Sequence, residues 1–458
     1  MSTLTAQAPR PAPTADPVVE GIDLRKLSPA DATRMVEIVL TFARHGALVV
    51  ARRGPFLVIR PRRRAPRALA VAARRSFVDL GPTFVKLGQL IASSPGLFPG
   101  TLSEEMRRLL DSVPPEPAHR VRRIIRKELG APVSELFERF DDRPVAAASI
   151  AQVHRAWLRD GTSVAVKVRR PRLSGRIERD LRLLRLLALV IEQAGAVGEM
   201  ANPVAIVDDF AVTLRAELDF RNEAGWMVDF ERNLRSFGDN DRVLAPTPVP
   251  DMVSRRVLVM SFVEGRPVDD VIRGGGATHD LEELLIASIR AWAEGALVHG
   301  LFHGDVHAGN LFVTPEGRVV FLDFGIMGRL EDRVRRAVLD ALPPILLAQD
   351  WAAAARLVVE LAETSRPIDA QALARDIGEM ATPVMAVRLA DVSLGEVLSK
   401  VIAAGTRHKL RLPRELVLVA KQMLYFERYA KAMAPDYQLL ADPRIMATIV
   451  PGIVSREQ

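Results

Sequence analysis

The stretch His299–Gly325, HGLFHGDVHAGNLFVTPEGRVVFLDFG, decides the fold of this chain. It contains two short apolar runs, Leu311–Val313 and Val319–Leu322, on either side of a turn at Pro315–Gly317. Short apolar runs separated by Pro and Gly predict a β-hairpin. The polar residues that flank the hairpin would then lie close together around it.

Three of those polar residues carry the chemistry. Asp305 is followed five residues later by Asn310, and Asp323-Phe324-Gly325 comes directly after the hairpin. Phosphoryl transfer needs one carboxylate to orient the attacking oxygen, and an Asn and a second Asp to hold Mg²⁺ against the phosphates. The D-x4-N spacing and the later D-F-G match the catalytic loop and metal motif of kinases.

The composition is that of an ordinary globular protein. The chain has 458 residues, enough for about two to three domains, with 48% hydrophobic and 26% charged residues. It has no cysteine, which excludes disulfides and thiolate metal sites and suits a reducing compartment. The sequence contains no run of 18 uncharged apolar residues, so we predict no transmembrane helix. We expect a cytoplasmic location.

Positive charge is concentrated near the N-terminus. The segment from Arg44 to Arg75 holds ten Arg and no acid, within a net charge of +7. Such a block favours contact with an anionic surface, and lipid on the inner face of a membrane is favoured over nucleic acid because aromatic residues make up only 5% of the chain. A solvated basic face is the alternative.

Four helical segments are expected before residue 135. They are Leu27–Gly46 with Ser28 as N-cap, Ala65–Ser94 broken near Gly81-Pro82, a short helix opened by Thr101, and Ala118–Leu129 ended by Gly130. Within the second segment, Lys86 and Gln89 are three residues apart and share a helix face, while Gly88 would let another backbone approach closely.

A strand pair follows. Ser149–Leu158 and Ser163–Val168 read as strands joined by the turn Asp160-Gly161, and Lys167 lies in the second strand, as the phosphate-binding Lys of kinases does. Where a glycine-rich phosphate loop is expected, alanine occupies every glycine position. This loop must therefore cradle phosphates differently and more rigidly; its nucleotide-binding candidates are Ala146, Ala147, Ala148, Ser149, Ile150, Ala151 and Val153.

Two further helices, Leu173–Gln193 and roughly Val204–Phe230, are predicted next. The second carries Glu217, Asp219 and Glu223, and kinases pair the strand Lys with a helix Glu. Glu223 and Asp219 are four residues apart and would share a face.

The strand-like Arg256–Val263 then leads to Glu264-Gly265, where an adenine-contacting hinge is expected, with Met260 and Val263 as contacts.

The segment after Gly325 is short. A helix, Asp280–Val298, enters the catalytic loop, and helical pattern resumes by about Glu331. That leaves no room for the long activation segment ending in A-P-E with which a protein kinase docks its peptide. The rest, to about Ala447, reads as helical, with breaks at Pro343-Pro344 and Pro367.

Taken together, these motifs resemble the AarF/UbiB family of atypical kinases. The resemblance covers roughly Val36 to Pro435 and rests on Lys86-x-Gly88-Gln89, the alanine loop, Lys167, Glu217-x-Asp219, HGDVHAGN and D-F-G. It implies an α+β, two-lobed protein kinase-like fold that binds ATP or ADP with Mg²⁺ and supports isoprenoid-quinone biosynthesis or lipid homeostasis at a membrane.

The resemblance also implies residue roles. Lys167 would pair with Glu223, Asp305 would be the catalytic carboxylate, and Asn310 and Asp323 would hold metal. Lys86 and Gln89 would lie over the nucleotide cleft, with Glu217 and Asp219 beneath them. The implied domains are a flexible tail (1–20), a helical extension (21–135), an N-lobe with inserted helices (136–265), a helical C-lobe (266–447) and a second tail (448–458).

The function expected is an ATP-dependent phosphotransferase or ATPase acting on a lipid or small molecule, with nucleic acid not expected as a partner. One alternative is a small-molecule phosphotransferase of the aminoglycoside or choline kinase type, which shares the HGD-x4-N loop but lacks the Lys86–Gln89 motif. The other is an ATP-gated lipid-binding chaperone with incidental turnover. The acceptor, the pathway and the oligomeric state are left open by these residues.

Overall fold

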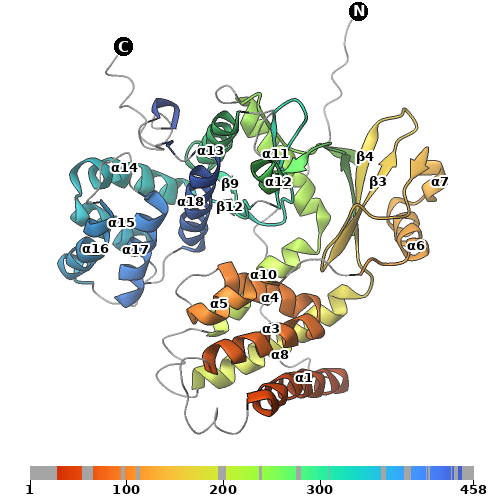
Figure 1. Cartoon of the computed structure of the whole chain (residues 1–458), viewed down its shortest axis with the longest axis horizontal. Helices are drawn as coiled ribbons and strands as arrows, with labels where there is room; N and C mark the ends of the chain where they lie inside the picture. The colour runs from red at the N-terminus through yellow and green to blue at the C-terminus, as the bar shows by residue number, and fades with distance from the viewer. Residues whose placement is uncertain are drawn as a thin grey trace, which may run out of the picture. The chain divides into compact units, whose positions relative to one another are not determined.

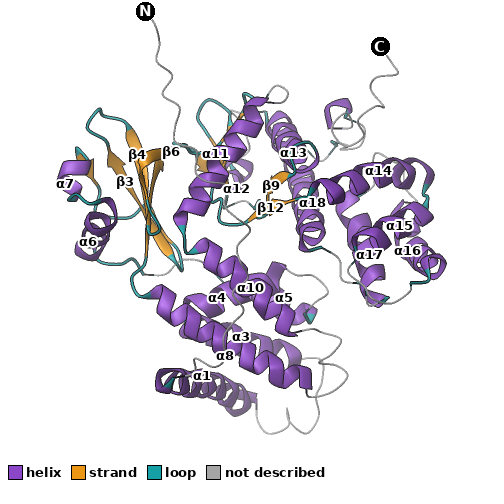
Figure 2. Ribbon diagram, turned by 180° about the vertical axis from the view of Figure 1, so that it is seen from behind, coloured by secondary structure: helices purple, strands orange, loops and turns teal. Residues whose placement is uncertain are grey.

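The computed structural model describes residues 28–53, 65–93, 98–109, 114–193, 203–236, 240–274, 280–307, 309–362, 368–385, 393–408, 410, 413–434, 436–437 and 442–445 (Figures 1 and 2). The two predicted tails, the arginines Arg60 to Arg64 and the predicted break at Pro367 lie outside these residues. The chain divides into two compact units, Met1–Asn222 with Pro248–Phe262, and Glu223–Thr247 with Val263–Gln458.

The first unit contains an antiparallel sheet in the order β1-β3-β4-β7-β6, with β2 paired to β3. The predicted strand pair is confirmed, and Gly161 takes a left-handed φ of 83° in its turn. The strands are β1 Arg139–Phe140, β2 Ala146–Ala147, β3 Ala151–Trp157, β4 Ser163–Arg169, β6 Pro248–Val253 and β7 Val257–Ser261.

One face of this sheet is covered by α6 (Ala118–Leu129), which stands beside β3 and β4 together with α7 (Val133–Leu136) in Figure 2. Successive strand residues point to opposite faces, so Val164, Val166 and Val168 share one side. Val121 and Ile125 of α6 are buried against that side in one apolar cluster. As predicted, α6 ends at Gly130, which has a φ of 80°.

The remaining helices of this unit are α1 Pro29–Arg53, α3 Ala65–Leu80, α4 Pro82–Ser93, α5 Gly100–Met106, α8 Leu173–Gln193 and α10 Pro203–Glu217. The predicted start at Ser28 and the break at Gly81-Pro82 are confirmed: Asp31 accepts hydrogen bonds from Ser28, and Gly81 has a φ of 92°. The prediction that Thr101 opens α5 is wrong, because Pro99 is the N-cap and no side chain caps the helix.

The single helix predicted for Val204–Phe230 is also wrong, because the chain breaks between α10 and α11 (Phe220–Ser236). Asp219 lies in the break, where its carboxylate accepts a hydrogen bond from the backbone N–H of Arg221 at 3.2 Å. A carboxylate that caps a new helix in this way competes with continuation of the old one. Asp219 and Glu223 therefore do not share a face of one helix.

The second unit is built around the predicted hairpin, which is confirmed: Leu311 pairs with Phe321 and Val313 with Val319. Its sheet has the order β5-β11-β10-β8, and β9 pairs with β12 separately. The strands are β5 Val243–Leu244, β8 Arg266–Pro267, β9 Leu301–His303, β10 Leu311–Val313, β11 Val319–Phe321 and β12 Met327–Arg329.

Its helices, besides α11, are α12 Val268–Arg273, α13 Leu281–Leu297, α14 Asp332–Ala348, α15 Trp351–Leu361, α16 Ala370–Met385, α17 Leu394–Arg407 and α18 Arg414–Met433. The predicted break at Pro343-Pro344 is wrong, since both prolines lie inside α14. Ala337, Ala341 and Ile345 are buried in the cluster that joins α14 to α17, and this packing offsets the hydrogen bonds that the prolines remove.

None of the described helices is long and apolar enough to span a membrane.

Gly88 has a packing role that can be tested. A Cβ at this position would overlap the Leu109 side chain and lie 3.0 Å from the Phe77 ring. Side chains and not another backbone therefore pack against Gly88, so the expected approach of a backbone is wrong. Gly88→Ala should destabilise the protein by about 1–3 kcal/mol through overpacking. Gly46→Ala, at an open helical position, should instead stabilise it by about 0.5–1 kcal/mol. Urea denaturation compares them, and equal effects would contradict this account.

Candidate functional site

Asp305 lies between β9 and β10 of the second unit. Its Oδ1 is 2.8 Å from Lys421 Nζ, and its Oδ2 is 3.6 Å from His307 Nε2. Burial alone raises the pKa of this carboxyl, but the charges of Lys421 and His307 outweigh burial and hold the pKa of Asp305 below its usual value. Asp305 is therefore ionised at neutral pH, as an acceptor of a proton must be.

The backbone around Asp305 is held by buried side chains. The amide of Gln422 accepts from Val306 N at 2.8 Å and donates to Gly304 O at 2.7 Å. His303 Nδ1 accepts from Asp305 N at 3.2 Å. Backbone groups in a buried loop have no ladder partners, and these side chains supply them. The loop is thus fixed on both sides of Asp305.

Asn310 is brought next to Asp305 and to the D-F-G segment. Its side-chain Nδ2 donates to the backbone O of Asp305 at 3.0 Å, and its backbone carbonyl oxygen accepts from Leu322 N at 2.8 Å. Leu322 directly precedes Asp323. The structure therefore brings three sequence-predicted residues, Asp305, Asn310 and Asp323, together around one hairpin.

Asp323 has an unusual backbone. Its φ is 54°, in the left-handed region that non-glycine residues rarely adopt, and the residue is exposed. The next residue, Phe324, is fully buried, with its ring 5.2 Å from both Phe230 and His303. Burial of Phe324 fixes the turn and leaves the adjacent Asp323 at an exposed position.

Glu223 lies in the first turn of α11 and is 5% exposed. The same helix carries Phe230, which packs against both Phe321 and Phe324. The position of α11 is thereby tied to the D-F-G segment. Its pairing with Lys167, which lies in the other unit, stays a prediction.

In the first unit, Lys167 sits in β4 opposite Val153 of β3, with Nζ 5.4 Å from the Phe220 ring centroid. Of the two expected adenine contacts, Met260 lies in β7, paired with Ala165, while Val263 follows that strand and is half-buried. Their contact with adenine stays a prediction.

The alanine loop forms a tight turn between β2 and β3. Ala146 pairs with Val153, Ala147 pairs with Gln152, and Ala148 N donates to Ala151 O at 2.8 Å. None of these residues has a positive φ, so the turn does not need glycine.

Arg170 holds that turn in place. Its Nε donates to Ala148 O and its backbone N to Ile150 O, both at 2.9 Å. Ser149, Ile150 and Ala151 are buried.

Lys86 of α4 forms an ion pair with Glu217, the last residue of α10, at 3.0 Å. Gln89 lies one turn further along α4 and is half-buried. Asp219 pairs with Arg221 at 2.6 Å; burial raises the pKa of Asp219, but hydrogen bonds from Arg221 outweigh it and lower the pKa overall. The structure thus brings Lys86 and Glu217 together. The place of Lys86 and Gln89 over a nucleotide cleft, with Glu217 and Asp219 beneath them, stays a prediction.

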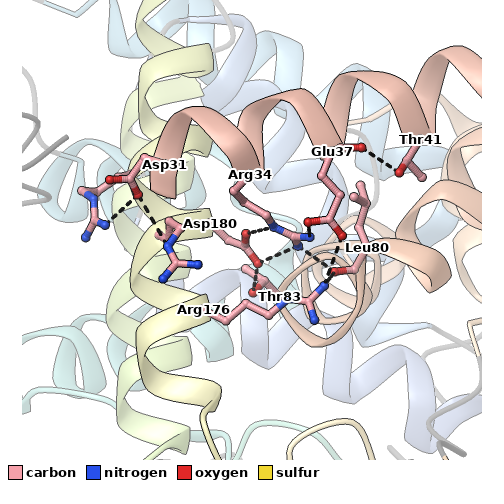
Figure 3. A network of polar contacts seen from close by, with 10 residues as sticks. Asp31, Arg34, Glu37, Thr41, Leu80, Thr83, Arg176 and Asp180 are labelled. Carbon is pink, nitrogen blue, oxygen red and sulfur yellow. Dashed lines mark hydrogen bonds and ion pairs between the residues drawn. The ribbon is translucent and has the colours of Figure 1, made fainter. Parts of the chain in front are cut away.

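A buried polar network holds α4 in its place (Figure 3). Asp180 of α8 is fully buried, and it accepts from Arg34 Nε at 2.7 Å and Thr83 Oγ1 at 2.7 Å. Arg34 Nη2 also donates to Leu80 O at 2.7 Å. Thr83 is in the first turn of the helix that bears Lys86, so this network joins α1, α4 and α8 around one carboxylate.

The donor set suits a hard cation. Asn310 and Asp323 offer oxygen ligands, and Mg²⁺ commonly uses one or two carboxylates together with substrate phosphates and water. The described residues hold no group of three or more His, Asp or Glu placed to bind a metal by themselves. A magnesium ion here would therefore depend on phosphate oxygens as further ligands.

Sequence reasoning missed Lys421 and Gln422. Their only signal is an adjacent Lys and Gln inside the otherwise apolar stretch LVLVAKQMLYF of α18. It also missed Asp180, which looks like an ordinary surface acid of an Arg-rich helix until Arg34 and Thr83 are folded onto it.

A half-open pocket of about 420 Å³ lies beside the loop that carries Asp305. His307 and Gly309 of the loop line it, together with residues of α12 and α18, which are Asp269, Ile272, Arg273, Tyr425, Arg428, Tyr429 and Ala432. His307 lies between the pocket and Asp305. The pocket is the right size for a small molecule.

The fold and this loop define the chain as a protein kinase-like protein. Two families match it: the ABC1 atypical kinase-like domain at residues 108–358 and the UbiB helical domain at residues 377–438. The chain belongs to this AarF/UbiB family of atypical kinases.

Relatives agree with this assignment. An uncharacterized protein of Mycobacterium tuberculosis is 41% identical over 371 residues, covering 81% of this chain and 76% of that protein. An uncharacterized chloroplastic aarF domain-containing protein kinase of Arabidopsis thaliana is 32% identical, covering 81% and 73%. A protein of Marinobacter nauticus named probable protein kinase UbiB is 32% identical, covering 80% and 67%.

Among solved structures, a Mycobacterium tuberculosis protein in complex with erythromycin matches with a TM-score of 0.50 and 24% identity. The match covers 78% of this chain and 93% of the other. At this identity the likeness shows the fold alone.

The network at Asp180 can be tested against a surface ion pair between neighbouring helices. Asp180→Ala should cost about 3 kcal/mol or more, because Arg34 loses its buried partner carboxylate and keeps only that of the exposed Glu37. Asp79→Ala, which removes an exposed carboxylate and its contacts with Arg44 and His45, should cost about 1 kcal/mol or less. Thermal and urea unfolding measure both, and a loss at Asp180 no larger than that at Asp79 would contradict the role of the network.

Proposed function

We propose that the protein is an ATP-dependent, Mg²⁺-requiring phosphotransferase or ATPase. The observation that carries this proposal is the arrangement of Asp305, Asn310 and Asp323 around one hairpin, with Asp305 ionised and its loop backbone fixed. A fixed carboxylate beside two oxygen ligands is what phosphoryl transfer needs, since catalysis there is mostly positioning and charge stabilisation.

Each residue has a role in the proposed reaction. Asp305 orients the attacking hydroxyl or water and accepts its proton, while Asn310 and Asp323 hold the metal. When bound, Mg²⁺ would neutralise charge on the phosphates. In this proposal Lys167 would hold the α- and β-phosphates, Glu223 would orient Lys167, and the alanine loop would supply main-chain groups to the phosphates.

The acceptor proposed is a lipid or another small molecule rather than a peptide. Two observations support this. Only residues 326–331, including β12, lie between D-F-G and α14, so the long segment with which a protein kinase docks peptide is missing there. The pocket beside His307 offers a site of small-molecule size.

The pathway proposed is isoprenoid-quinone biosynthesis or lipid homeostasis at a membrane. It rests on the family and on relatives named probable protein kinase UbiB, and on the basic segment Arg44–Arg75, which suits anionic lipid. The testing experiment is ATP hydrolysis with and without anionic liposomes and with simple phenols that resemble quinone precursors. Stimulation by acidic lipid that weakens with salt supports the proposal. Hydrolysis indifferent to every addition contradicts the membrane role.

Two substitutions separate nucleotide binding from turnover. Asp323→Asn should abolish Mg²⁺-dependent nucleotide binding, because a metal ligand is lost. Asp305→Asn should leave affinity nearly intact and reduce turnover by about 100-fold or more. Calorimetry and a hydrolysis assay measure these, with Asp340→Asn on the exposed side of α14 as control. Equal turnover in wild type and Asp305→Asn would favour the ATP-gated chaperone instead.

The alanine loop allows a further prediction. We expect the loop and the Lys86 helix to hold the nucleotide in a pose unsuited to phosphorylating proteins. The backbone carbonyl of Ala148 accepts a hydrogen bond from Arg170, which holds the turn. Ala148→Gly should make the turn more flexible, because glycine can adopt backbone conformations that cost alanine about 1 kcal/mol. Ala148→Gly and Lys86→Ala should each increase transfer of radiolabelled phosphate to the protein's own Ser and Thr residues. The idea fails if wild type labels itself as readily as either variant.

A further inference from the structure

Helix α18 places two adjacent polar residues against the catalytic loop. Lys421 Nζ contacts Asp305 Oδ1 at 2.8 Å, and the two side chains are 11% and 27% exposed. Gln422 is fully buried, and its amide spans Asp305 by bonding Val306 N and Gly304 O. One turn of one helix therefore holds both the carboxylate and the backbone on its two sides.

The helix is itself docked firmly. Phe426 lies one turn after Gln422 and packs against Trp292 of α13 at 5.6 Å between ring centroids. The indole Nε1 of Trp292 donates to His303 O at 2.9 Å, at the start of the same loop. The aromatic contact between Phe426 and Trp292 and the buried hydrogen bond of Trp292 thus fix the position of α18 relative to the loop.

This contact joins two parts of the chain that match different families. The loop falls in the ABC1 atypical kinase-like domain match, and α18 falls in the UbiB helical domain match. Between Asp305 and Asn310 the loop sequence is VHAG, with neither Lys nor Arg. The lysine that pairs with Asp305 therefore comes from α18 and not from the loop itself.

A cation at this position has a clear chemical use. A carboxylate that must orient a hydroxyl needs a fixed direction, and a charge-assisted hydrogen bond to one of its oxygens leaves the other for the acceptor. Lys421 donates a hydrogen bond to Oδ1, whereas His307 lies 3.6 Å from Oδ2, within ion-pair distance but beyond hydrogen-bond distance. Of the two carboxylate oxygens, Oδ2 is therefore the one that we assign to receive the proton.

Building on the proposed phosphotransferase function, we propose that Lys421 is a positioning residue of the catalytic loop. It holds the Asp305 carboxylate so that Oδ2 faces the acceptor, and Gln422 holds the loop so that the carboxylate stays there. In the transfer step, the proton of the acceptor hydroxyl passes to Asp305 Oδ2 and the acceptor oxygen bonds to the γ-phosphorus of ATP. The bond between this phosphorus and the β–γ bridging oxygen breaks, and ADP leaves. The UbiB helical domain is then part of the active site.

The test compares full-length wild type with Lys421→Met, Lys421→Arg and Lys431→Met. Lys431 lies on the same helix at an exposed position and serves as the matched control for loss of one positive charge. Lys421→Met should lower kcat for ATP hydrolysis by about 10-fold to 100-fold, while the Kd for Mg-ADP stays within about twofold. Lys421→Arg should recover part of kcat, and Lys431→Met should match wild type.

A double variant decides whether Lys421 acts through Asp305. If it does, Asp305→Asn with Lys421→Met should be no slower than Asp305→Asn alone, because residues that act as a unit are not additive. Independent, multiplying losses would overturn the assignment. So would unchanged kcat in Lys421→Met, or an equal loss of nucleotide affinity and kcat.

The failure of the proposed function looks different. If Asp305→Asn turns over ATP as fast as wild type, both the proposed phosphotransferase function and the role of Lys421 are overturned. If Asp305→Asn abolishes turnover but Lys421→Met has wild-type turnover, only the role of Lys421 is overturned.

Discussion

The catalytic loop of the second unit depends on one constraint, which is that buried backbone groups must find hydrogen-bond partners. Pairing with β12 ends near Gly304, whose N–H donates to Ile326 O, and the described structure gives the following residues Asp305 and Val306 no strand partner. The imidazole of His303, the indole of Trp292 and the amide of Gln422 supply the partners instead. Because these side chains come from a strand and two helices, the position of Asp305 depends on how these elements of the unit pack together.

The first unit solves a similar problem with charge. Asp180 is fully buried, and a buried carboxylate is costly unless it is paired and hydrogen-bonded. Arg34 and Thr83 meet both conditions, and by doing so they fix the helix that carries Lys86. The position of Lys86, and with it the ion pair to Glu217, therefore depends on the more deeply buried ion pair of Asp180 and Arg34.

Much of the site could be predicted from the sequence because its signals are local. The hairpin after Asn310, the turn at Gly161, the helix end at Gly130 and the break at Gly81-Pro82 each follow from the conformations that a few neighbouring residues allow. The failures share another cause. Asp219 ends a helix by capping the next one, and α14 continues through Pro343-Pro344 because its apolar face is buried. Tertiary contacts overrode local preference at both places.

The sequence by itself determined the identity and order of the chemical groups: Asp305, Asn310 and Asp323 at kinase spacing, Lys167 in a strand, and alanine in place of glycine. Short spacing in one hairpin is enough to bring such groups together. Only the tertiary structure decided that Lys421 and Gln422, more than a hundred residues away, reach Asp305, and that Arg34 reaches Asp180. The physical reason is that contacts at long sequence separation depend on which helix faces are buried together, and no local pattern records that choice.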